Sequence, residues 1–82
     1  RRPGPKTTPV RELRLAKDVR ARMPAFLMTV HVYDEDAAKR FVYINGRKIR
    51  QGGLSREDIS VEQILPDGAV LSFDGHRFWQ ER

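Results

Sequence analysis

The sequence predicts a small all-β domain of mainly antiparallel strands, arranged as a sandwich or a partly open barrel of two short sheets. Three observations support this fold class. Two Asx-Gly pairs each separate two strand-like runs, an earlier run alternates strictly, and no segment is long enough for the helix of a parallel crossover. The length of 82 residues allows one domain with a small core. We therefore expect about five or six strands, preceded by a short helix.

The first 24 residues differ in character from the rest of the chain. Residues 1–9 contain three prolines and one glycine, a composition typical of the end of an extended linker. From Val10 to Met23, apolar residues recur every three or four positions, which predicts an amphipathic helix over residues 10–24. Pro24 disfavours helical geometry at Met23 and ends this helix. Residues 25–82 then form the β-domain.

The run from Phe26 to Tyr33 alternates as a half-buried strand does. The face expected to be buried comprises Phe26, Met28, Val30 and Val32. The opposite face comprises Leu27, Thr29, His31 and Tyr33.

Two hairpins follow, and their turns fix the register. Asn45-Gly46 and Asp74-Gly75 each suit a two-residue turn whose central residues need positive φ. The first turn pairs Ile44 with Arg47, Tyr43 with Lys48, Val42 with Ile49 and Phe41 with Arg50. The second pairs Phe73 with His76, Ser72 with Arg77, Leu71 with Phe78 and Val70 with Trp79. A further turn is predicted at Pro66-Asp67-Gly68, where proline supplies a fixed φ and glycine a permissive one. The expected core comprises Met28, Val30, Val32, Val42, Ile44, Ile49, Ile64, Leu71, Phe73 and Phe78.

Composition argues against several kinds of chemistry. The chain has no cysteine, which excludes disulfides and thiolate metal sites, and its longest apolar run, residues 25–28, is far too short to cross a membrane. Its two histidines, His31 and His76, have no spacing typical of a metal site, and no nucleophile motif is present. We therefore expect no catalytic residue, no cofactor and no metal.

Charge is concentrated at the N-terminus. Residues 1–22 carry eight basic and two acidic residues, whereas residues 23–82 carry eight basic and nine acidic ones, within a net charge of +5. Because the β-domain has no net positive charge, it lacks the field that recruits nucleic acid.

One local pattern keeps a second function open. The basic residues Arg47, Lys48 and Arg50 flank the aromatic residues Tyr43 and Phe41 across one hairpin. A small single-stranded nucleic-acid-binding module with an OB-like barrel would display such a face. Alternatively, the aliphatic stems of the basic residues cover the rings on a solvated face. Trp79 likewise either closes the core or anchors a partner.

Several segments together resemble a known family. The segments are His31-Val32-Tyr33, the run from Arg40 to Arg47 around Asn-Gly, the run from Ile64 to Leu71 around Pro-Asp-Gly, and the run from Phe73 to Phe78. In order and spacing they are similar to the C-terminal periplasmic domain of general secretory pathway protein B, a component of the type II secretion system of Gram-negative bacteria.

The resemblance implies a periplasmic domain tethered to the inner membrane by an anchor outside this chain, which would then be a fragment. It also implies a function without catalysis, in which the domain binds the outer-membrane secretin, sometimes with a partner ATPase, and helps to assemble or stabilise the pore. Nucleic acid would not be a partner. We expect the contact to be an edge strand that accepts a strand of the partner. The expected contact residues are Thr29, His31 and Tyr33, with Arg40 and Arg77 as cationic neighbours.

Overall fold

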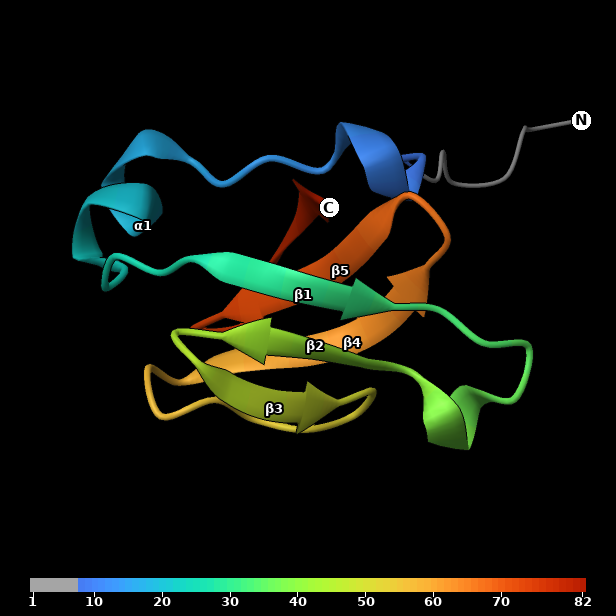
Figure 1. Cartoon of the computed structure of the whole chain (residues 1–82). Coiled ribbons are helices and arrows are strands. Elements are labelled where there is room, and N and C mark those ends of the chain that lie inside the picture. The colour runs from blue at the N-terminus through green and yellow to red at the C-terminus, as the bar shows by residue number, and fades with distance from the viewer. Residues whose placement is uncertain (1–7) are drawn as a thin grey trace, which may run out of the picture.

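The computed structural model describes residues 8–82 and shows two three-stranded antiparallel sheets that face each other (Figure 1). Sheet A has the strand order β1-β2-β3 and sheet B the order β4-β5-β6. The predicted sandwich is therefore confirmed, and the sheets do not close into a barrel. The strands are β1 (Met28–Val32), β2 (Phe41–Ile44), β3 (Arg47–Arg50), β4 (Ile59–Leu65), β5 (Gly68–Phe73) and β6 (His76–Glu81). The helical elements are the 3-10 turns η1 (Val10–Glu12) and η2 (Ala37–Lys39) and the helix α1 (Lys17–Arg22).

Both predicted hairpins form with the predicted pairs of residues. Asn45 and Gly46 have φ values of 51° and 80°, and Asp74 and Gly75 have 52° and 78°, as a two-residue type I′ turn requires. Pro66 and Asp67 form the third turn, but Gly68 does not serve it through a positive φ. A Cβ atom on Gly68 would lie 2.5 Å from Trp79 Cζ2, so this residue is glycine because the indole packs against its backbone.

The core lies between the two sheets. Six of the predicted core residues are buried there, while Met28 and Phe73 pack against them partly buried. The six are Val42, Ile44, Ile49, Ile64, Leu71 and Phe78. The prediction missed Ile59, Val61 and Ala69. A register shift in β4 between Val61 and Gln63 turns both Val61 and Ile64 inward, although they are three residues apart.

A β-bulge in β1 overturns the predicted face of that strand. Met28 pairs with Ile44, but Val30, and not Thr29, pairs with the next residue, Tyr43. The extra residue shifts the alternation by one position. Val30 and Val32, predicted for the core, therefore turn outward, and Val30 is 41% exposed. His31 lies opposite the buried Val42 and turns inward instead.

The N-terminal helix is shorter than predicted. Instead of one helix over residues 10–24, the chain forms η1, an extended segment and then α1. The break occurs where Leu13 adopts extended geometry and its carbonyl accepts the backbone N–H of Trp79 at 3.1 Å. Isolated helices of this length are marginal in water, so packing against β6 decides the conformation. The prediction of a linker concerns residues 1–9, of which residues 1–7 lie outside the described part.

The N-terminal segment covers two sides of sheet B. Leu15 and Val19 are buried against the core between the sheets, which completes it at its open side. On the other face of sheet B, Trp79 is buried, and the Arg11 guanidinium carbon lies 5.2 Å from the centre of its ring. Trp79 is thus buried on this side of sheet B, but it does not belong to the core between the sheets.

Candidate partner-binding surface

Among the described residues, three of the four sheet edges carry backbone contacts or charge. Along β4, Gly52 donates to the Val61 carbonyl at 2.7 Å and Val61 donates to Gly53 at 2.9 Å. On the outer side of β6, the Trp79 N–H donates to the Leu13 carbonyl. On β3, the Arg50 carbonyl accepts from the Gly53 N–H at 2.8 Å, and basic side chains line this short strand, which discourages further pairing. The fourth edge is β1.

The outer edge of β1 offers the backbone groups of His31. In a two-residue hairpin the residues next to the turn form a hydrogen-bonded pair, and such pairs alternate along the ladder. The register then turns the backbone of Tyr43 and Phe41 toward β1, and that of His31 away from β2. The same alternation places the Trp79 N–H on the outer side of β6, where it does donate to Leu13. No backbone contact outside the sheet is made by Thr29–Val32 in the described part of the chain.

The sequence predicts that the His31 side chain points away from the core, whereas the structure turns it toward the β4–β5 turn. Its Nε2 lies 2.7 Å from the Leu65 carbonyl oxygen and 3.0 Å from that of Gly68. Because both partners are carbonyl oxygens, which only accept, Nε2 carries a proton and donates it. The Nδ1 atom is buried and has no hydrogen-bond partner among residues 8–82. His31 therefore ties β1 to the β4–β5 turn through its ring and presents only its backbone at the edge.

Tyr33 and Arg40, two of the predicted contact residues, meet at the end of β1. The Arg40 guanidinium carbon lies 4.5 Å from the centre of the Tyr33 ring, and Nη2 donates to the phenol oxygen at 3.3 Å. Arg40 also donates from Nε to the Asp34 carbonyl at 2.6 Å and from Nη1 to Gln51 Oε1 at 3.3 Å. Arg40 thus fixes the loop after β1, while Tyr33 stays 38% exposed. Thr29 is exposed at the bulge.

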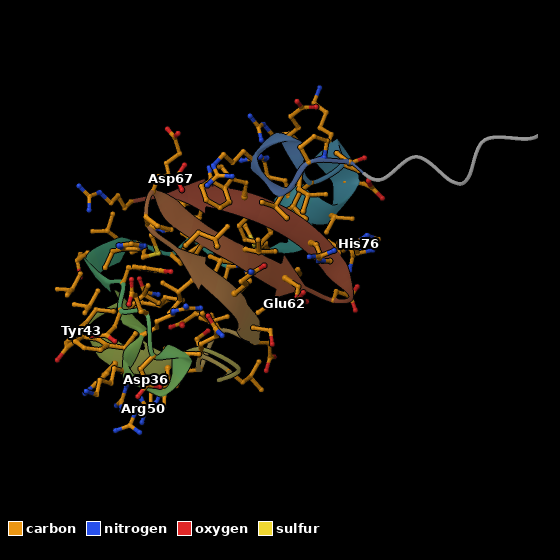
Figure 2. The ribbon with its side chains drawn as sticks, turned by 90° about the vertical axis from the view of Figure 1, so that its right-hand side faces the viewer. Asp36, Tyr43, Arg50, Glu62, Asp67 and His76 are labelled. Carbon is orange, nitrogen blue, oxygen red and sulfur yellow. The ribbon has the colours of Figure 1, made fainter. Side chains whose placement is uncertain are left out.

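Arg77, the remaining predicted contact residue, is not brought together with the others. It lies on β6 in sheet B, and its Nε is 3.0 Å from Glu62 Oε1 on β4. Figure 2 shows Glu62 on sheet B, away from the labelled Tyr43 and Arg50 of sheet A. No described hydrogen bond or ion pair joins Arg77 to β1. Its described ion pair, with Glu62, lies within sheet B.

The predicted turn residues have a second role that the sequence did not indicate. Asp67 accepts two hydrogen bonds from Arg11, at 2.5 and 2.7 Å, and Asp74 accepts one from Arg22 at 2.8 Å. These hydrogen bonds and the positive charge of the guanidinium groups lower the pKa of both carboxyl groups. Asn45 Oδ1 accepts from the Leu27 N–H at 2.9 Å. The turns therefore hold the chain that leads into α1 and β1.

The outer face of sheet A is the other surface that the sequence singled out, and the bulge enlarges it. Lys48 Nζ lies 4.3 Å from the centre of the Phe41 ring, and the Phe41 and Tyr43 rings are 6.0 Å apart. The basic side chains partly cover the aromatic ones, as the solvated-face alternative describes. Because Val30 and Val32 pair with Tyr43 and Phe41, they join this face.

Within residues 8–82 the structure shows no enclosed site for a ligand or a metal ion. The described surface has no pocket, and no group of three or more His, Asp or Glu side chains could hold a metal ion. Each described helix is too short to cross a membrane. The two candidate surfaces described above, a strand edge and a sheet face, are both open surfaces.

Comparisons with known proteins give the family. A family model described as type II secretion system protein B matches residues 23–82. Two similar proteins are both called general secretion pathway protein B. The one from Dickeya dadantii (strain 3937) is 34% identical over 56 residues, which is 68% of this chain and 26% of that protein. The one from Klebsiella pneumoniae is 29% identical over 75 residues, which is 92% of this chain and 41% of that protein.

The chain thus spans less than half the length of these relatives. No solved structure matches it significantly. The family model covers both sheets and leaves out only the chain up to Arg22, so the match concerns the part that carries the β1 edge. On these matches, the chain belongs to the type II secretion system protein B family.

Proposed function

We propose that this chain is a non-catalytic periplasmic domain that binds the outer-membrane secretin and helps to assemble or stabilise the secretion pore. The observation that carries the proposal is the free outer edge of β1, with the backbone of His31 directed away from β2. Membership of a secretion-system family agrees with a role in assembly.

The mechanism is β-augmentation. A strand of the secretin adds to β1, main-chain hydrogen bonds to His31 supply affinity, and the side chains at the edge supply selectivity. The His31 ring holds β1 in place through the Leu65 and Gly68 carbonyls, so the edge is formed before the partner arrives. Tyr33 lies two residues after His31 and stacks with Arg40, and it gives the incoming strand an aromatic contact.

In this proposal the domain works at a distance from the inner membrane. The tether lies outside this chain, in a full-length protein comparable with the longer relatives. A partner ATPase of the secretion system is a second proposed contact. It would act through the remainder of the full-length protein or through a surface other than β1.

A nucleic-acid-binding module is the weaker alternative. The two sheets form a sandwich and not the OB-like barrel that such a module would use. Two cations, Lys48 and Arg50, lie on the aromatic face. Neutralising about two phosphates gives a weak, salt-sensitive interaction.

Amide hydrogen exchange tests the secretin contact without altering the domain. We expect purified periplasmic domains of the secretin to slow exchange of the His31 amide in the ¹⁵N-labelled chain. The Lys48 amide, which faces outward on the opposite edge of sheet A, serves as the internal control. Secretin binding that leaves the His31 amide unprotected would show that the edge is wrongly assigned.

A matched pair of variants separates the backbone of His31 from its ring. His31→Ala and His31→Pro both lose the ring contacts with Leu65 and Gly68, but only proline removes the outward N–H. We expect the alanine variant to keep most of the secretin affinity and the proline variant to lose it. Proton NMR spectra check that both variants are folded, and equal affinities of two folded variants would contradict the proposal.

A further inference from the structure

The outward side of sheet A forms a continuous surface, here called the aromatic–basic face. Its residues stand in two rows across the three strands. The rows are Val30, Tyr43 and Lys48, and Val32, Phe41 and Arg50. The face is therefore graded, with aliphatic side chains on β1, aromatic ones on β2 and cations on β3.

This face is accessible in the described part of the chain. Figure 1 views it from the front, and none of the residues 8–82 crosses it. In Figure 2, Tyr43 and Arg50 lie on the side of sheet A that is away from sheet B. Val30 is 41% exposed, Lys48 and Arg50 are exposed, and the other three side chains are half-buried.

The cations of the face lack carboxylate partners within residues 8–82. The ion pairs in that range use Arg11, Arg22 and Arg77, none of which belongs to the face. The loop after β1 is acidic, and two of its carboxylates bind backbone. Asp34 accepts from the Asp36 N–H at 2.8 Å, and Asp36 accepts from the Ala38 N–H at 3.0 Å. Lys48 and Arg50 therefore remain available to acidic groups from outside.

We propose that the aromatic–basic face docks an amphipathic helix of a partner protein, whose apolar stripe is flanked on one side by Asp or Glu. Three strands spaced about 4.8 Å apart make a face roughly 10 Å wide, which is about the diameter of one helix. A sheet buries its face against a helix or another sheet, whereas an added strand pairs with an edge. The apolar stripe lies over Phe41 and Tyr43, and the acidic flank reaches Lys48 and Arg50.

Charge disfavours two other occupants, a second copy of this chain and residues 1–7. A second copy of this chain would offer α1, whose charged residues are Lys17, Asp18, Arg20 and Arg22, so it would bring mainly positive charge to a positive face. Residues 1–7 carry Arg1, Arg2 and Lys6 and no acid. An acidic helix from another protein is complementary where these segments are not. The proposal does not depend on the β1 edge, because it uses side chains and not the backbone of His31.

Two synthetic helical peptides test the proposal. Both carry the same leucine stripe, flanked on one side by Glu in the first peptide and by Lys in the second. We expect the Glu peptide to shift amide signals of β2 and β3 in the ¹⁵N-labelled chain and to bind about tenfold more tightly than the Lys peptide. The Lys48→Glu/Arg50→Glu variant should reverse this preference. Arg20→Glu/Arg56→Glu makes the same charge change at exposed positions off the face and should leave the preference intact.

Each alternative occupant has its own signature. Equal affinity for the two peptides, or shifts on sheet B, would overturn the proposal. Tighter binding of a thymidine oligonucleotide to the same amides would assign the face to nucleic acid. Shifts of those amides that grow with protein concentration alone would assign it to a second copy. His31→Pro removes no side chain of the face, so a folded variant should still bind the Glu peptide even if secretin binding is lost, and the two proposals fail separately.

Discussion

Replacing Gly68 with alanine tests the packing of the β4–β5 turn against Trp79. The added Cβ would lie 2.5 Å from both the Gln80 carbonyl oxygen and Trp79 Cζ2, whereas ordinary contacts begin near 3.4 Å. One neighbour is backbone of the paired strand and cannot rotate away, so the strands or the indole must move by nearly an ångström. Overpacking of this kind costs about 1–3 kcal/mol, and we expect a value at the upper end. For a domain of this size, that lowers Tm by about 10–20 °C.

Thermal unfolding followed by the fluorescence of Trp79, the single tryptophan, measures this change. A displaced indole should also shift the emission of the folded variant. Gly75→Asn is the control, because Gly75 has a φ of 78° and nothing within 4 Å of its Cβ position, and asparagine tolerates that geometry. We expect that variant to lose only about 1 kcal/mol from backbone strain at the positive φ, clearly less than Gly68→Ala. A Gly68→Ala protein as stable as the control would refute the inferred packing.

Three further predictions concern the turns and the bulge. The pKa values of Asp67 and Asp74 are lowered by Arg11 and Arg22, so their stabilisation is complete above the ordinary carboxyl pKa of 3.8 and is lost as the pH falls through the lower folded values. NMR titration of an Arg11→Gln variant should show the pKa of Asp67 returning upward while that of Asp74 stays low. Val42→Ala should destabilise the domain by about 2 kcal/mol or more and Val30→Ala by less than about 1 kcal/mol in urea unfolding, whereas the reverse order would place Val30 in the core. Deleting Thr29 removes the extra residue and leaves Met28 and Val30 on consecutive partners, so the fold should persist with a more regular edge. Bulges protect edges from pairing, so sedimentation should show stronger self-association of this variant than of the wild type.

Local turn chemistry explains why both hairpins could be predicted from the sequence. Asn45-Gly46 and Asp74-Gly75 supply the positive φ values of a two-residue turn, and that turn leaves a single register for the strands on either side. Once the register is set, alternation decides which side chains are buried. Val42, Ile44, Leu71 and Phe78 follow directly from it.

The face of β1 could not be predicted in the same way, because distant contacts determine it. The run from Phe26 to Tyr33 alternates strictly and contains no residue that signals a bulge. The side chain of Asn45 holds Leu27, and the β4–β5 turn offers two carbonyls to the ring of His31. Meeting both demands requires one extra residue between Met28 and Val30.

The sequence correctly predicts a strand at the candidate edge. It predicts the wrong groups of His31 at that edge. His31 was expected to offer its side chain, and it offers its backbone. Arg77 was grouped with β1 because of its charge alone, and its ion pair with Glu62 on the other sheet could not be seen from sequence spacing. The shortened N-terminal helix has the same origin, since the Leu13 carbonyl is taken by Trp79 of the last strand.

The N-terminal segment makes its polar contacts with sheet B. Arg11 binds Asp67 and stacks on Trp79, and Leu13 accepts from the edge of β6, so the chain enters the domain along sheet B (Figure 2). Each exposed ion pair contributes little alone, but the segment also buries Leu15 and Val19. A pull on this segment would therefore load sheet B first. Under both proposals, the partner surfaces are the β1 edge and the aromatic–basic face, and both belong to sheet A.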